Sequence, residues 1–316
     1  MITKEQITEA HERIRPYVHR TAVLTNSTID KITSATVFFK CENFQKVGAF
    51  KARGAVNAVL QVKKAGEFDT VTAHSSGNHA QAIAYAAKIT GLSASIVIPR
   101  TAPHIKKEGV RSYGAEILEC EPTLEARENG VRKIMDSRKA AFIHPFDNDH
   151  VITGQATAAK ELIEDAGTLL DFIVAPVGGG GLLSGTVLSA RYFSPSTQVV
   201  GAEPEGAADA VYSIKSGKIE QPGNTNTIAD GLLTPLSQRT LAIIREGVAG
   251  IFLVSDEEIS QAMRLLWERM KIIVEPSGAV PLAVVIKNKE QFAGKRIGII
   301  LSGGNVDLAK LPFNPA

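Results

Sequence analysis

Hydrophobic and polar residues alternate along this chain with two different periods. Short runs rich in β-branched and apolar residues predict strands, and the longer stretches between them carry apolar residues at helical spacing. The predicted strands cover residues 36–41, 70–73, 95–98, 116–119, 172–177, 198–202, 251–254 and 296–301. Because strands and helices alternate, we expect an α/β fold with a mostly parallel sheet and crossover helices.

Two of the predicted helices have clear start signals. Thr3 is followed at the third position by Gln6, and Ser255 by Glu258, which is the spacing of a capping box. The second of these helices should bury a stripe made of Ile259, Met263, Leu266 and Met270. These side chains therefore belong to the core rather than to a cofactor site.

The length of the chain bears on its domain organisation. A chain of 316 residues is long enough for about two domains. No repeat, low-complexity segment or Pro/Ser-rich linker separates them, so contacts rather than a tether should divide the domains. We expect residues 67–147 to form a smaller domain that binds the substrate, inserted into a larger, cofactor-binding one made of residues 1–66 and 148–316.

Composition excludes several classes of protein. Lys and Arg number 35 against 33 Asp and Glu, which gives a net charge of +2, and the charges are not gathered into blocks. The sequence therefore shows no basic patch for binding nucleic acid or a membrane surface. Cys41 and Cys120 cannot form a disulfide framework, so a reducing, cytoplasmic setting is expected. The chain shows no signal peptide and no apolar run of membrane-spanning length.

The glycines are placed unevenly. Four of the 27 glycines are consecutive and lie between a predicted strand and an apolar helical stretch: Gly178, Gly179, Gly180 and Gly181. Such a loop can direct backbone N–H groups at a phosphate, or it can be only a tight connection. Leu182 interrupts the dinucleotide pattern G-x-G-x-x-G, and Thr186 replaces the lysine of a P-loop. A phosphate bound here should therefore belong to another kind of cofactor.

A second polar group follows the predicted strand at 70–73. It consists of Ser75, Ser76, Gly77, Asn78 and His79. Hydroxyls, an amide and the N–H groups of a helix start could together bind a carboxylate, although ordinary helix capping is the simpler alternative.

Two further segments carry candidate chemistry. Lys51 lies among small and apolar residues, and a desolvated lysine loses its charge more easily and can form a Schiff base. Ser302 follows the predicted strand at 296–301, at the end of the sheet where α/β folds bind ligands. Lys51 could instead be a surface residue and Ser302 part of a turn, but four such sites in one chain favour a shared function.

These segments together resemble the fold-type II pyridoxal-phosphate enzymes, in particular the serine racemase and serine/threonine dehydratase family, which includes 3-hydroxyaspartate dehydratases. The matching segments are G-A-F-K-A-R-G-A, S-S-G-N-H, the four glycines, T-I-A-D-G, V-E-P-S-G and S-G-G-N. The resemblance covers almost the whole chain. It implies a fold like that of the tryptophan synthase β subunit, with two open, twisted, mostly parallel sheets and flanking helices.

The resemblance implies pyridoxal 5'-phosphate as the cofactor. Lys51 would form the Schiff base, Phe50 would pack beside the ring, and the four glycines would hold the phosphate. Asn78 would contact the ring hydroxyl and Ser302 the pyridine nitrogen. The two remaining cofactor contacts would be Gly231 and Glu275. A serine does not keep the ring nitrogen protonated as a carboxylate would, which favours loss of a β-leaving group over transamination.

The same resemblance implies how a substrate is handled. Its carboxylate would bind the loop Ser75, Ser76, Gly77, Asn78 and His79, and Lys51 would remove the Cα proton. Ser76 resembles the second acid/base of racemases, on the opposite face of the ring. Elimination of the β-hydroxyl would give a 2-oxo acid and ammonia, and reprotonation from the Ser76 side would give the other enantiomer.

A divalent cation is implied as well. In the racemases that this chain resembles, the equivalents of Glu203, Asp209 and the carbonyl of Ala207 bind the ion, and such hard oxygen ligands suit Mg²⁺, Ca²⁺ or Mn²⁺. Without that resemblance the two carboxylates would be interpreted as a solvated surface.

Two features concern ligand choice and regulation. Arg127 matches an arginine near the mouth of the site and could bind a second substrate carboxylate, as in 3-hydroxyaspartate.

Eukaryotic relatives carry F-Q-K-T-G-S-F-K near an ATP site, but Val47 and Ala49 replace its Thr and Ser here. ATP activation is therefore in doubt. The chain ends soon after Asn305, so we expect no regulatory extension.

The leading hypothesis is β-elimination and racemisation of small β-hydroxy amino acids by a cytoplasmic homodimer, with serine and threonine as the first candidates. A 3-hydroxyaspartate ammonia-lyase is the main alternative. A β-replacement synthase would not be expected to keep Ser76 and the Glu203 cluster, and a non-catalytic phosphate-binding protein would leave Lys51 unexplained.

Overall fold

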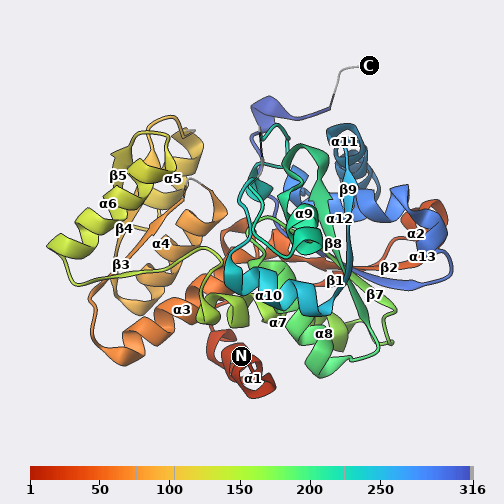
Figure 1. Ribbon diagram of the computed structural model, residues 1–316, viewed down its shortest axis with the longest axis horizontal. Helices are drawn as coiled ribbons and strands as arrows, with labels where there is room; N and C mark the ends of the chain where they lie inside the picture. The colour runs from red at the N-terminus through yellow and green to blue at the C-terminus, as the bar shows by residue number, and fades with distance from the viewer. Residues whose placement is uncertain (76, 103, 222, 224, 314–316) are drawn as a thin grey trace.

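The computed structural model describes residues 1–75, 77–102, 104–221, 223 and 225–313 (Figure 1). Its ten strands are β1 (Val23–Leu24), β2 (Thr36–Cys41), β3 (Thr70–His74), β4 (Ser93–Pro99), β5 (Glu116–Cys120), β6 (Ala140–Phe142), β7 (Phe172–Pro176), β8 (Gln198–Pro204), β9 (Val248–Val254) and β10 (Arg296–Leu301). They form a six-stranded sheet in the order β1-β2-β10-β7-β8-β9 and a four-stranded sheet in the order β5-β4-β3-β6. Only the pair β1–β2 is antiparallel among the described strand pairs.

The helices that connect and cover these strands are α1 (Lys4–Ile14), α2 (Ser27–Thr33), α3 (Lys51–Ala65), α4 (Asn78–Thr90), α5 (His104–Arg111), α6 (Leu124–Ser137), α7 (Asp149–Asp165), α8 (Gly181–Phe193), α9 (Asp209–Ser216), α10 (Gln238–Gly247), α11 (Asp256–Leu265), α12 (Pro276–Lys287) and α13 (Lys289–Phe292). Short 3-10 turns include η3 (Glu205–Ala207) and η4 (Asp230–Leu232). Among the described residues, no helix is both long and apolar enough to span a membrane.

The predicted α/β class and parallel sheets are confirmed. All eight predicted strands are present, and both predicted capping boxes form, at Thr3 with Gln6 and at Ser255 with Glu258. The short strands β1 and β6 were not predicted. The four-stranded sheet takes all its strands from residues 70–142, while the domain boundaries at 66/67 and 147/148 stay a prediction.

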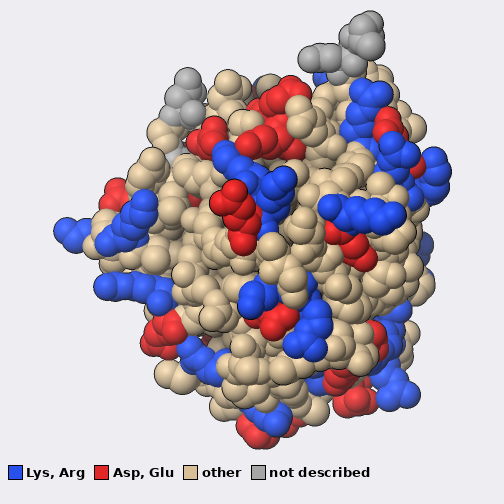
Figure 2. All heavy atoms as spheres, turned by 90° about the vertical axis from the view of Figure 1, so that its right-hand side faces the viewer, with Lys and Arg blue, Asp and Glu red and all other residues tan. Residues whose placement is uncertain are grey.

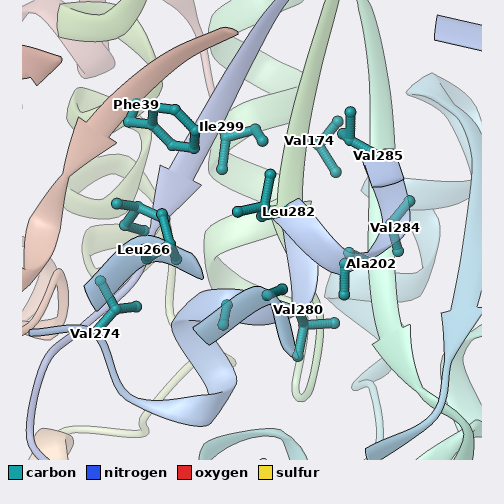
Figure 3. Close-up of a cluster of buried hydrophobic side chains, with 14 of the residues drawn as sticks. Phe39, Val174, Ala202, Leu266, Val274, Val280, Leu282, Val284, Val285 and Ile299 are labelled. Atoms are coloured by element: carbon teal, nitrogen blue, oxygen red, sulfur yellow. The ribbon is translucent and has the colours of Figure 1, made fainter. Parts of the chain in front are cut away.

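The six-stranded sheet is covered on both faces, which explains why its strands read as continuous apolar runs. Val174 of β7 faces a core that includes α11 and α12, whereas its neighbours Ile173 and Ala175 face a second core that includes α7 and α8. Figure 3 shows the first core, where Leu282 and Val285 of the central α12 lie near Val174. Because β2, β10, β7, β8 and β9 run parallel, their carboxyl ends lie at one edge of the sheet.

The predicted stripe of α11 is buried at Ile259, Met263 and Leu266. Met270 is only partly buried but packs against the same core, at the end of a π-turn over Leu266–Met270. On the face drawn in Figure 2, Lys and Arg side chains lie among Asp and Glu side chains rather than in one patch.

Candidate active site

Three loops that follow parallel strands carry predicted site residues, and the loop after β10 contacts the start of α3. The glycine loop leaves β7, Ser302 follows β10, and the loop with Ser75 leaves β3. The backbone N–H of Phe50 donates to the carbonyl of Ser302 at 3.0 Å, and Ala49 forms a β-bridge with Gly303. These contacts fix Lys51, the first residue of α3, at the carboxyl edge of the large sheet.

The amine of Lys51 is held in a desolvated position. Its Nζ donates to the carbonyl of Pro145 at 3.0 Å and lies 5.1 Å from the ring centroid of Phe50. Desolvation by burial lowers the pKa of Lys51 to about 8. A larger fraction of this amine is therefore neutral near physiological pH than of an ordinary lysine, as a nucleophile or base requires.

The glycine loop forms a cradle at the start of α8. A Cβ atom at Gly178 would lie 2.9 Å from Leu232 Cα, and one at Gly179 would overlap the ring of Phe146. Gly180 has φ +84°, a left-handed conformation, and α8 begins at Gly181. Because glycines have no side chain to cover them, the backbone N–H groups at this helix start are free to bind a phosphate group.

A chain of amide and carboxyl groups links three segments distant in sequence. Asn305 Nδ2 donates to Asn78 Oδ1 at 2.9 Å, and Asn78 Nδ2 donates to Glu275 Oε1 at 2.9 Å. Burial, and then the charge of Asp230, raise the pKa of Glu275 to about 8. A Cβ at Gly303 would lie 2.5 Å from Glu275 Oε1, so the glycine makes room for this carboxyl group. The N–H of Gly231 donates to Ser277 Oγ at 3.0 Å.

The loop between β3 and α4 is partly described. Ser75 Oγ accepts from the N–H of Gly77 at 3.2 Å, and α4 begins at Asn78. His79 is buried, with Nε2 3.0 Å from the carbonyl of Ile143, and burial lowers its pKa to about 3. Ser76 lies outside the described residues.

Arg127 lies in the first turn of α6, half-exposed, where its Nε donates to the carbonyl of Thr123 at 3.3 Å. Burial, and next the charge of Arg127, lower the pKa of His74. Helix α6 packs against β3, and the Ser75 loop starts at the end of that strand.

The predicted metal ligands lie at the end of β8. Glu203 is buried, and its two oxygens accept from the N–H groups of Ala210 at 2.7 Å and Val211 at 3.0 Å. Asp209 and Ala207 are also buried, and neither carboxylate oxygen of Asp209 has a hydrogen-bond partner among the described residues. Burial raises the pKa of Asp209 to about 6 and that of Glu203 to about 8. Two buried carboxylates, of which that of Asp209 has no hydrogen-bond partner among the described residues, fit a hard cation.

A structural role for Arg53 could be expected from the sequence, but the partners through which it holds the first turn of α3 could not. The fully buried guanidinium of Arg53 lies between Glu42 and Glu161, with Nε 2.7 Å from Glu42 Oε2 and Nη2 2.7 Å from Glu161 Oε2. Lys40 Nζ is 2.6 Å from Glu161. These buried pairs, each satisfied by its partner, tie α3 to α7 and β2.

Comparison with known proteins identifies the family. The family model described as pyridoxal-phosphate dependent enzyme matches residues 14–303. This chain belongs to the pyridoxal-phosphate-dependent enzymes. The β-hydroxyaspartate dehydratase of Paracoccus denitrificans (strain Pd 1222) is 49% identical to it over 312 residues, which cover 99% of each chain.

Two further relatives of this pyridoxal-phosphate-dependent enzyme have solved structures. The serine racemase of Dictyostelium discoideum is 48% identical, and its crystal structure matches with a TM-score of 0.92 over 97% of this chain and 99% of that chain. A threonine deaminase from T.th. is 41% identical, and its crystal structure matches with a TM-score of 0.92 over 99% of this chain and 100% of that chain. The predicted family and fold type are confirmed.

Proposed function

We propose that this enzyme catalyses β-elimination of small β-hydroxy amino acids to a 2-oxo acid and ammonia, and racemises the same substrates. The observation that carries the proposal is the desolvated amine of Lys51, which follows Phe50 beside Ser302 and donates to Pro145, the neighbour of the Phe146 ring on Gly179. The names of the similar serine racemase and threonine deaminase support the same chemistry.

Pyridoxal 5'-phosphate, when bound, supplies the electron sink that makes the Cα–H bond of an amino acid acidic. In our proposal the N–H groups of Gly178, Gly179, Gly180 and Gly181 hold its phosphate. Asn78 binds the ring hydroxyl and Ser302 the pyridine nitrogen. Phe50, Gly231 and Glu275 line the same pocket.

Lys51 moves the proton at Cα. Its neutral amine is the base, and burial keeps that form accessible near pH 8. The loop that contains Ser75, Gly77 and His79 binds the α-carboxylate, with N–H groups at the start of α4 as donors. In our proposal Ser76, the second acid/base that the family resemblance implies, returns a proton to Cα during racemisation.

A divalent cation, Mg²⁺, Ca²⁺ or Mn²⁺, completes the proposal. The carboxylates of Glu203 and Asp209 and the carbonyl of Ala207 would hold it, and the oxygens of Asp209, unpartnered among the described residues, support this assignment. We further propose a cytoplasmic homodimer, on the strength of the family resemblance, and Val47 and Ala49 leave activation by ATP an open question.

A second candidate function is the dehydration of 3-hydroxyaspartate. The specific observation that favours it is the 49% identity to a β-hydroxyaspartate dehydratase. Arg127 would then bind the second carboxylate, since α6 packs against β3, at whose end the substrate loop begins.

Product assays on the purified holoenzyme test both candidates. L-serine, L-threonine and L-threo-3-hydroxyaspartate are incubated side by side, and 2-oxo acid, ammonia and the D-enantiomer are measured. Lys51→Ala should abolish every product and the absorbance band of the lysine-bound cofactor. Arg127→Ala should lower kcat/KM for 3-hydroxyaspartate about a hundredfold and leave L-serine nearly unchanged. Wild-type enzyme that carries the cofactor and yields none of these products would contradict the proposed function.

A further inference from the structure

His144 has a fixed tautomer. Its Nδ1 accepts hydrogen bonds from the backbone N–H of Phe146 at 3.3 Å and of Asp147 at 2.8 Å. A ring nitrogen that accepts hydrogen bonds carries no proton, so the proton of the neutral ring is on Nε2. No described residue accepts a hydrogen bond from Nε2, and the side chain is only half-buried.

The ring of His144 lies among the three parts of the active site. It packs edge-on against Phe146, with centroids 4.6 Å apart, and Phe146 in turn lies against Gly179 of the glycine loop. On another side its centroid is 6.4 Å from that of His74, the last residue before the Ser75 loop. The next residue, Pro145, accepts the hydrogen bond from Lys51 Nζ. The ring of His144 is thus packed between the residue that lies on the glycine loop and the residue that precedes the Ser75 loop, one position before the acceptor of the Lys51 hydrogen bond.

The surroundings keep His144 neutral. Burial lowers its pKa to about 4, and the positive charges of Lys51 and Arg239 act in the same direction, while Asp147 opposes them. A neutral imidazole is a hydrogen-bond donor rather than a strong acid, which suits the recognition of an uncharged or weakly basic oxygen.

We propose that Nε2–H of His144 donates a hydrogen bond to the oxygen on the β-carbon of the substrate, and that His144 thereby determines specificity for hydroxy amino acids. The inference rests on the proposed function and assigns the group that recognises the leaving oxygen. During elimination the Cα–H and Cβ–O bonds break, Lys51 takes the proton, and the oxygen leaves with the bonding pair. It departs as water once it receives that proton, so no further reactant is needed.

Two variants separate the role of the Nε2–H donor from that of the hydrogen bonds that Nδ1 accepts from Phe146 and Asp147. His144→Asn places a carbonyl oxygen where Nδ1 accepts from Phe146 and Asp147, but it lacks a donor at the position of Nε2. His144→Gln reaches that position with an amide N–H and loses the loop contacts instead. Each holoenzyme is assayed with L-serine, whose hydroxyl needs a donor, and with β-chloro-L-alanine, whose chloride leaves without one.

We expect His144→Asn to lower kcat/KM for L-serine at least about tenfold and to change elimination from β-chloro-L-alanine by less than about twofold. His144→Gln should recover part of the activity on L-serine. Long-range ¹H–¹⁵N NMR spectra of the wild-type protein without substrate should show the Nε2–H tautomer of His144 between pH 6 and pH 8.

Three results would overturn the inference: unchanged L-serine dehydration by His144→Asn, equal loss on both substrates, or an Nδ1–H tautomer. Equal loss would mean that His144 only holds its loop. If the wild-type enzyme carries the cofactor but eliminates from neither substrate, the proposed function fails instead, so the two failures are distinguishable.

Discussion

Asn78 donates a 2.9 Å hydrogen bond to the buried carboxyl group of Glu275, 197 positions away in the chain. The contact joins the start of α4 to the start of α12, so it connects an element beside the four-stranded sheet with one that packs on the six-stranded sheet. Asn305 extends it with its own hydrogen bond to Asn78. The orientation of the Asn78 amide is therefore set from two sides.

The raised pKa of Glu275 predicts how stability depends on pH. The folded protein favours the protonated carboxyl up to a pKa of about 8, whereas the unfolded chain loses this proton near 4.5. The contribution of Glu275 to stability is thus complete below pH 4.5 and is lost as pH rises through 8. Glu275→Gln keeps an oxygen for Asn78 but cannot ionise. Relative to the wild type it should gain at least about 1 kcal/mol of unfolding free energy between pH 5 and pH 9.

Urea denaturation at pH 5, 7 and 9 measures this difference, with the substitution of the exposed Glu125 by Gln as the control. Parallel pH curves for Glu275→Gln and the wild type would show that the buried carboxyl is already ionised at pH 5.

Ser76→Ala tests the second face of the substrate. The alanine removes the hydroxyl that we propose returns a proton to Cα, while Lys51 is untouched. Racemisation of L-serine should fall at least about a hundredfold, and 2-oxo acid formation from L-serine should keep most of its rate. Chiral chromatography and a 2-oxo acid assay on the same samples give both rates. An equal loss of both products would assign Ser76 to substrate binding rather than to proton transfer.

Much of this site could be predicted because its chemistry follows strands with strong local signals. The glycine loop and Ser302 directly follow β7 and β10, whose apolar runs are unambiguous in the sequence. In contrast, β6 covers only Ala140–Phe142 and has no alternating pattern. The loop after it, which brings Pro145 to Lys51 and Phe146 to Gly179, therefore went unrecognised.

Arg53 shows a second limit of sequence reasoning. Its position two residues after Lys51 is evident in the sequence, but its partners Glu42 and Glu161 lie 11 and 108 positions away. Only the folded packing of α3 against α7 brings these charges together, and no local pattern encodes such a pairing.

Asp209→Asn tests the cation site. In the wild-type enzyme, removal of divalent ions by a chelator should lower the melting temperature by about 5 °C, and Mg²⁺ should restore it. The variant should respond to neither treatment. In the ion-free state it should be more stable than the wild type, because the substitution removes a buried carboxylate whose oxygens have no partner among the described residues. A wild-type melting temperature that is insensitive to chelation would argue against a metal at Glu203 and Asp209.

Gly179→Ala tests the cradle at the start of α8. The added methyl group would overlap the ring of Phe146, which packs against His144 and cannot withdraw without moving the loop that carries Pro145. Overpacking of this kind costs about 1–3 kcal/mol.

The matched control is Gly250→Ala in β9, where the new Cβ would lie 3.7 Å from Phe252 Cε2, an ordinary contact. Gly179→Ala should weaken binding of pyridoxal 5'-phosphate at least about tenfold, measured by absorbance titration of the apoenzyme, and the control should bind it as the wild type does. Equal affinity in all three proteins would show that the loop can shift without loss of its phosphate contacts, and the cradle would then lie elsewhere.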